Sequence, residues 1–143
     1  MKRLTRILLP AVIVLTAVLI LTGCGSSADD KTADDKKTYR QVSPEEAAAM
    51  MEEETDYIIL DVRTQEEYET AHISGAICIP NETIGTGDIP ELPDKDQLIL
   101  VYCRSGNRSK QASEKLAKQG YTNIVEFGGI NSWTSKTVSG SEA

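Results

Sequence analysis

Short runs of continuous apolar residues, separated by segments with helical patterns, constrain the fold of this chain most strongly. Residues 57–62 (YIILDV), 76–80 (AICIP) and 98–102 (LILVY) are apolar at nearly every position. Strands of this composition are buried on both faces of a sheet, as in parallel sheets. Residues 39–42 (YRQV) and 123–127 (NIVEF) are further candidate strands. We therefore predict an α/β fold, with a small, mostly parallel sheet of about five strands and helices on both faces.

The segments between these strands carry signals for the start and end of helices. Ser43 with Glu46, and Thr64 with Glu67, have the spacing of a capping box, in which each side chain satisfies the other residue's backbone N–H group. Gly120 is suited to end the third helix. The predicted helices are SPEEAAAMMEEE (43–54), TQEEYETA (64–71), SKQASEKLAKQG (109–120) and a short one in GGINSW (128–133), with residues 81–97 mainly loop.

The start of the chain has a different composition. Residues 1–6 carry three basic residues, and residues 7–21 are almost wholly apolar, which is short for a bilayer-spanning helix of about 20 residues. The following LTGC, ending at Cys24, resembles a bacterial lipobox. We predict that residues 1–23 are a lipoprotein signal peptide that is removed, and that Cys24 receives a lipid. A plain N-terminal anchor helix is the alternative. Both predict an extracytoplasmic domain attached to a bacterial cell membrane.

Residues 24–38 contain small, polar and charged residues and no large apolar one, so they cannot bury enough surface to become ordered. We predict that they form a flexible tether before a domain at residues 39–143, which we expect to be monomeric. Removing the three basic residues of the leader would change the net charge from −7 to −10. This acidity argues against nucleic acid as a partner and against direct binding of the domain to anionic lipid. Membrane attachment would depend on the lipid.

Cysteine and histidine usage argues against a disulfide framework and against a zinc site. Beyond Cys24 the chain has two cysteines, Cys78 and Cys103, fewer than disulfide-stapled secreted domains carry. Cys78 lies between two isoleucines, and we expect it to be a small buried apolar residue. A single histidine cannot form a Cys/His cluster with zinc-ligand spacing. We predict neither a metal nor a cofactor.

The stretch CRSGNRS (103–109) follows the most apolar strand and precedes a helix. Ligands bind at the carboxyl ends of strands in such sheets, and a loop that leads into a helix points its N–H groups inward. Arg104 and Arg108 add positive charge, and Gly106 allows a backbone conformation that a side chain would forbid. These surroundings lower a thiol pKa. We predict that Cys103 is a thiolate nucleophile in a cradle for anions.

Three segments together resemble a single-domain rhodanese, a sulfurtransferase: LDVRTQEEYETAHISGAICIP, CRSGNRS and GGINSW. The resemblance covers about residues 39–137. It implies that Cys103 takes sulfane sulfur from a donor such as thiosulfate, forms a persulfide, and passes the sulfur to cyanide or a thiol. The residues that would bind the substrate are Arg104, Ser105, Gly106, Asn107, Arg108, Ser109 and Arg63.

The same resemblance assigns roles outside the loop. Asp61 and Arg63 match family positions near the site, although Arg63 could instead only pair with acidic neighbours. His72 matches a structural histidine, which we expect to hydrogen bond locally. We expect Trp133 to lie in the core.

Three other functions remain open. Phosphatases and arsenate reductases of the same fold have a longer loop, whereas the segment from Cys103 to Arg108 is one residue shorter and better sized for one sulfur atom. No candidate leaving-group acid stands out. A non-catalytic rhodanese-like binding module would usually lack the cysteine. A redox role would need Cys78, in a different strand, as the resolving partner.

Overall fold

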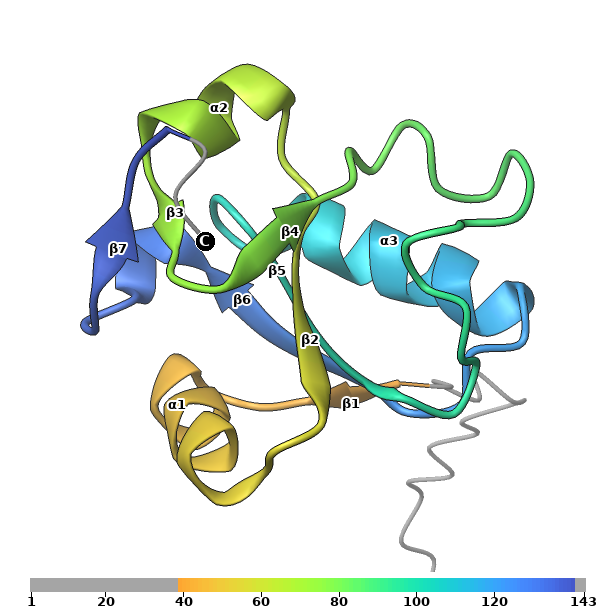
Figure 1. Ribbon diagram of the computed structural model, residues 1–143, viewed down its shortest axis with the longest axis horizontal. Helices are drawn as coiled ribbons and strands as arrows, with labels where there is room; N and C mark the ends of the chain where they lie inside the picture. The colour runs from red at the N-terminus through yellow and green to blue at the C-terminus, as the bar shows by residue number, and fades with distance from the viewer. Residues whose placement is uncertain (1–38, 141–143) are drawn as a thin grey trace, which may run out of the picture. The chain divides into compact units, whose positions relative to one another are not determined.

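The computed structural model describes residues 39–140 (Figure 1). Its main sheet has five strands in the order β1-β6-β5-β2-β4, and every neighbouring pair is parallel. The strands are β1 (Arg40–Gln41), β2 (Tyr57–Asp61), β4 (Ala76–Cys78), β5 (Leu98–Cys103) and β6 (Ile124–Gly129). The predicted α/β fold and its five strands are confirmed, with β5 at the centre.

A second, two-stranded sheet was not predicted. It pairs β3 (His72–Ile73) with β7 (Thr137–Val138) in antiparallel orientation. Neither His72–Ile73 nor Thr137–Val138 lies in an apolar run or an alternating segment long enough to indicate a strand in the sequence.

The helices are α1 (Pro44–Glu53), α2 (Gln65–Thr70), α3 (Asn107–Lys118) and the 3-10 helix η1 (Ile130–Ser132). The capping boxes predicted for α1 and α2 both form. Helix α3 begins two residues earlier than predicted, because Gly106 takes a left-handed conformation (φ 102°) as the residue before it. The left-handed region is readily available only to glycine.

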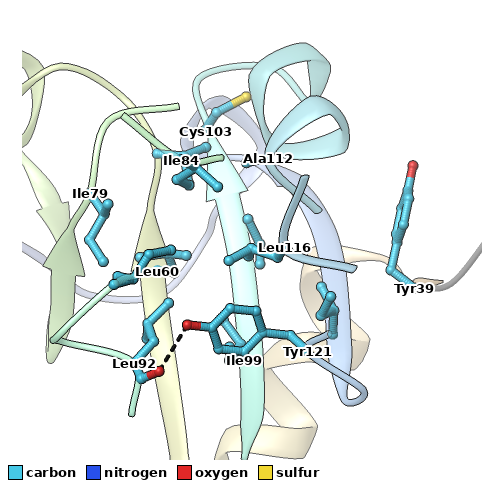
Figure 2. Packing of buried hydrophobic residues seen from close by; sticks show 14 residues of the cluster. Tyr39, Leu60, Ile79, Ile84, Leu92, Ile99, Cys103, Ala112, Leu116 and Tyr121 are labelled. Carbon is cyan, nitrogen blue, oxygen red and sulfur yellow. Dashed lines mark hydrogen bonds between the residues drawn. The ribbon is translucent and has the colours of Figure 1, made fainter. Parts of the chain in front are cut away.

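The core has two layers, one on each face of the sheet. Alternate residues of β5 point to opposite faces: Ile99 and Val101 pack with Leu116 of α3, and Leu100 packs with Ala47 of α1. The 79–97 loop adds apolar side chains to the α3 layer, and the Tyr121 hydroxyl donates a hydrogen bond to the Leu92 carbonyl at 2.8 Å (Figure 2). Complete burial of a leucine stabilises a fold by about 1.5–3 kcal/mol. Strand β5 is therefore held from both sides along its whole length.

Two residues expected in the core lie at its edge. Trp133 is partly buried and packs against Phe127, with ring centroids 5.6 Å apart. Cys78 is half-buried because β4 is an edge strand, which leaves one flank open.

The predicted signal peptide (1–23), the lipid site at Cys24 and the tether (24–38) lie outside the described residues. Between residues 39 and 140, no helix is long and apolar enough to cross a membrane.

Candidate active site

Cys103 is the last residue of β5, at the carboxyl end of the central strand. Its side chain is buried, with 1% of the residue exposed. Figure 2 shows the sulfur turned toward the first turn of α3. The left-handed Gly106 brings its N–H group back to the sulfur, at an N–Sγ distance of 3.1 Å. The loop from strand to helix therefore folds around the thiol.

The surroundings of Cys103 favour its thiolate form. Burial is the largest single influence and raises the thiol pKa. The Ser109 hydroxyl and the N–H groups of Ser109, Ser105 and Gly106 act against it, and the pKa of Cys103 falls below its ordinary value. At Cys78 burial and the charge of Asp61 instead raise the pKa to about 11. Cys103 is thus the more nucleophilic of these two thiols at neutral pH.

A buried carboxylate lies behind the loop, and sequence reasoning missed it. Glu126 of β6 is 2% exposed, and its Oε1 lies 2.6 Å from the Ser109 hydroxyl. Its oxygens also accept hydrogen bonds from the Gly128 N–H at 2.9 Å and the Gln41 side-chain amide at 2.8 Å. One signal was present in the sequence: a single acidic residue inside the apolar run of a strand.

Arg108 connects the loop to α2. Its two Nη atoms lie 2.6 and 2.9 Å from the two carboxylate oxygens of Glu67. This contact with Arg108 is the main cause that lowers the pKa of Glu67, to about 2. The pKa of Arg108 is raised by Glu67 first and also by the charge of Cys103. The guanidinium therefore lies within electrostatic reach of the thiolate while it holds α2 against the start of α3.

Arg63 and Arg104 line a pocket of about 240 Å³ beside the loop. Arg63 is buried, and its Nη2 lies 2.6 Å from Asp61 Oδ2 and 2.6 Å from the carbonyl oxygen of Ala71. Arg104 is exposed. The other lining residues are Glu67, Thr70, Ala71, Ile130 and Asn131. The pocket therefore has an exposed guanidinium, that of Arg104, beside the buried and ion-paired guanidinium of Arg63.

The remaining loop residues divide between surface and interior. Ser105 and Asn107 are exposed, while Gly106 and Ser109 are buried. Of the seven predicted substrate-binding residues, Arg63 and Arg104 line the pocket, and the others lie in the loop and first turn of α3 that follow Cys103.

Gly129 allows strand β6 to approach the backbone of the loop closely. It pairs with Cys103 across β5 and β6, and a Cβ atom at this position would overlap the backbone carbonyl of Arg104. The Asn131 N–H donates to the same carbonyl at 3.3 Å. The close approach of two backbones, and not an unusual φ angle, therefore requires glycine here.

His72 has the local role expected of it. It is fully buried, its Nδ1 lies 2.8 Å from the Tyr68 carbonyl oxygen, and its ring stacks on that of Tyr68 at 3.7 Å. Among residues 39–140, no group of three or more His, Cys, Asp or Glu side chains is arranged to hold a metal ion.

Comparisons with protein families and known proteins show what this chain is similar to. The family model "Rhodanese-like domain" matches residues 43–136. The thiosulfate sulfurtransferase PspE of Escherichia coli (strain K12) is 39% identical over 71 residues, which is 50% of this chain and 68% of that protein. The thiosulfate sulfurtransferase GlpE of Pseudomonas entomophila is 33% identical over 98 residues, 68% of this chain and 86% of that protein.

A solved structure described as a rhodanese with anions from E. coli shares 36% identity and a TM-score of 0.55, and the match covers 59% of this chain and 99% of that one. In other relatives, which combine adenylyltransferase and sulfurtransferase functions in their names, the match covers only 26% and 28% of the protein.

Proposed function

Because this chain belongs to the rhodanese-like domain family, we propose that it is a sulfurtransferase that carries sulfane sulfur as a persulfide on Cys103. The donor would be a small anion such as thiosulfate, and the acceptor cyanide or a thiol. One observation carries the proposal: a buried thiol at the end of β5 is surrounded by N–H donors and a hydroxyl that lower its pKa.

The first half of the reaction loads the sulfur. The Cys103 thiolate attacks the outer sulfur of thiosulfate, a new S–S bond forms, and sulfite leaves with the electron pair of the old S–S bond. The N–H groups of Ser105, Gly106 and Ser109 can then hold the negative terminal sulfur of the persulfide. The pocket lined by Arg63 and Arg104 would hold the anionic donor.

The second half of the reaction transfers the sulfur from Cys103 to the acceptor. A cyanide ion or an acceptor thiolate attacks the terminal sulfur, and Cys103 leaves as a thiolate with the electron pair of the S–S bond. A lowered pKa favours both halves, because it supplies the thiolate for attack and makes Cys103 a better leaving group. Neither half requires a general base once the thiolate is formed.

The test is a thiosulfate:cyanide assay paired with mass spectrometry of the protein. Thiosulfate alone should add the mass of one sulfur atom to the peptide that contains Cys103, and cyanide should remove it as thiocyanate. Cys103→Ser should abolish both, because a serine hydroxyl is not ionised at neutral pH, whereas Cys78→Ser should retain both. An active Cys103→Ser enzyme, or hydrolysis of an aryl phosphate with no sulfur transfer, would contradict the proposal.

We also propose that the domain is anchored outside the cytoplasm by lipid on Cys24, from the lipobox-like LTGC and the apolar leader before it. Radioactive palmitate should label the parent protein and should not label Cys24→Ala. Absence of label in the parent, together with unchanged detergent partitioning of the variant, would count against lipidation.

A further inference from the structure

Residues 137–140 follow η1 and contain the short strand β7. The family model matches residues 43–136, so this C-terminal segment lies beyond the matched region. Strand β7 pairs with β3, and Figure 1 shows the two strands side by side. Further along, the N–H group of Gly140 donates a hydrogen bond to the carbonyl oxygen of Glu69 in α2 at 2.8 Å. The C-terminal segment therefore contacts both α2 and the strand that follows it.

Helix α2 depends on other elements to keep its position. It has six residues, and none of them is buried. A helix this short is not stable by itself in water, so contacts with other parts of the chain must fix it. Near its start, Glu67 binds Arg108 of α3. Directly after its end, the carbonyl oxygen of Ala71 accepts a hydrogen bond from Arg63 at 2.6 Å.

The contact with Gly140 satisfies a backbone group at the end of α2. The last carbonyl groups of a helix have no partner in the next turn and need one from elsewhere. The Tyr68 carbonyl oxygen lies 2.8 Å from Nδ1 of His72, which is close in sequence. The Glu69 carbonyl instead accepts from Gly140, at the far end of the domain. Gly140 has a φ of 76°, in the left-handed region that glycine adopts readily.

Helix α2 forms one side of the pocket of about 240 Å³ beside the Cys103 loop. Glu67 and Thr70 of α2, and Ala71 directly after it, are among the lining residues. Arg104, which also lines the pocket, belongs to the loop. The position of α2 relative to the loop therefore determines the shape of the pocket beside Arg104.

We propose that Gly140 is a positioning residue for the donor pocket: its N–H group fixes the end of α2, and α2 fixes the side of the pocket that it forms. The thiol of Cys103 and its N–H donors belong to the loop between β5 and α3. Gly140 therefore affects how the donor binds and leaves the ionisation of the thiol unchanged. That the pocket holds the donor rests on the proposed function, whereas the contact between Gly140 and α2 does not.

The test compares Gly140→Pro with Gly140→Asn in the full chain. Proline has no N–H group to donate to Glu69 and cannot adopt a left-handed φ, so it removes the contact. Asparagine keeps the N–H group and tolerates the left-handed conformation, which makes it the matched control. Gly140 is exposed, and nothing lies within 4 Å of the position that a Cβ atom would take. Both variants should therefore fold.

We expect Gly140→Pro to raise KM for thiosulfate about three- to tenfold, because loss of one hydrogen bond lowers the fraction of molecules that have α2 in place. The value of kcat should stay within about twofold of the parent, since saturating donor restores the bound arrangement. Gly140→Asn should keep the parent KM. The pH midpoint for alkylation of Cys103 by iodoacetamide should be the same in all three proteins. Equal KM values in the two variants, or a shifted midpoint in Gly140→Pro, would overturn the proposal.

Amide hydrogen exchange provides a second measurement, which does not require sulfur transfer. The N–H groups of Tyr68 and Ala71 form backbone hydrogen bonds within α2. In Gly140→Pro they should exchange about threefold faster or more than in the parent, while β5 keeps its parental rates, because the opening is local. Unchanged exchange in α2 would overturn the proposal. If the parent transferred no sulfur, the proposed function would fail, and exchange in α2 would still decide whether Gly140 holds the helix.

Discussion

Cys103 shows how a buried residue is made reactive at the scale of single side chains. Burial alone would favour the neutral thiol, as it does at Cys78. The Ser109 hydroxyl and the N–H groups of Ser109, Ser105 and Gly106, the last at 3.1 Å from the sulfur, outweigh burial and lower the pKa of Cys103. These donors are fixed by the backbone of the loop and by the first turn of α3, so the thiolate is stabilised without rearrangement of the protein.

The exposed arginine of the loop has a separate role, which a substitution can reveal. We expect Arg104→Ala to lower kcat/KM for thiosulfate about tenfold, the order of magnitude for loss of one charge-assisted contact. Because screening acts on the same attraction, added salt should inhibit the parent more than the variant. Lys110→Ala, which removes the same charge from an exposed position on α3, serves as the control and should behave like the parent. If Arg104→Ala and Lys110→Ala have equal effects, Arg104 contributes only to the general charge of the surface.

At the scale of elements, the loop is held by a side chain from a helix distant in sequence. Glu67 accepts from Thr64 in the capping box of α2 and binds both Nη atoms of Arg108 at the start of α3. One carboxylate therefore completes a helix start and restrains the anion cradle. The ordinary pKa of Glu67 is 4.5 and it falls to about 2 in the folded protein.

The lowered pKa of Glu67 predicts how its contribution to the stability of the fold changes with pH. Glu67 stabilises the fold fully above pH 4.5, and its contribution is lost as the pH falls toward about 2. We expect Glu67→Gln to reduce the free energy of unfolding by about 1 kcal/mol at neutral pH, since the pair is partly exposed to solvent. Chemical denaturation from pH 7 to pH 2 should show the parent and the variant converge in the acid range. Glu66→Gln makes the same charge change in the same helical turn and should show a smaller difference; an equal one would argue against the contact with Arg108.

The elements that sequence reasoning predicted are those with a local signal. Continuous apolar runs identified β2, β4 and β5 of the main sheet, and the two capping boxes identified α1 and α2. The cradle from Cys103 to Ser109 was predictable for the same reason, because its residues are consecutive. Glu67 contacts Arg108, which is 41 residues away in the sequence, and Glu126 contacts Ser109, which is 17 residues away. No local sequence pattern predicts contacts between such distant residues. The β3–β7 pairing also joins distant segments through strands of two residues.

At the scale of the whole domain, the carboxyl ends of β5 and β6 must fit together for the site to exist. Gly129→Ala would push a methyl group into the backbone at Arg104, so we expect both a loss of stability of about 1–3 kcal/mol and a loss of sulfur transfer of at least about tenfold. The measurements are the denaturation midpoint and the thiosulfate:cyanide rate.

Gly128→Ala is the matched control. Gly128 has a φ of 88° and open space at its Cβ position, so alanine should cost about 1 kcal/mol through backbone strain and leave the loop in place. Full activity and parent stability in Gly129→Ala would contradict the close approach described above.

The position of Cys103 on the central strand also determines which openings of the domain expose it to solvent. Strand β5 is flanked by β2 and β6 and covered on both faces, so its amide protons should exchange with solvent only through the rarest, most complete openings of the domain. Local openings of the 79–97 loop or of the edge strands β1 and β4 would leave the backbone of Cys103 paired within the sheet. Bulky oxidants and bulky thiol reagents would then meet Cys103 mainly in molecules that have unfolded globally. In an oxidising compartment, the same burial that opposes ionisation would slow irreversible oxidation of the sulfur.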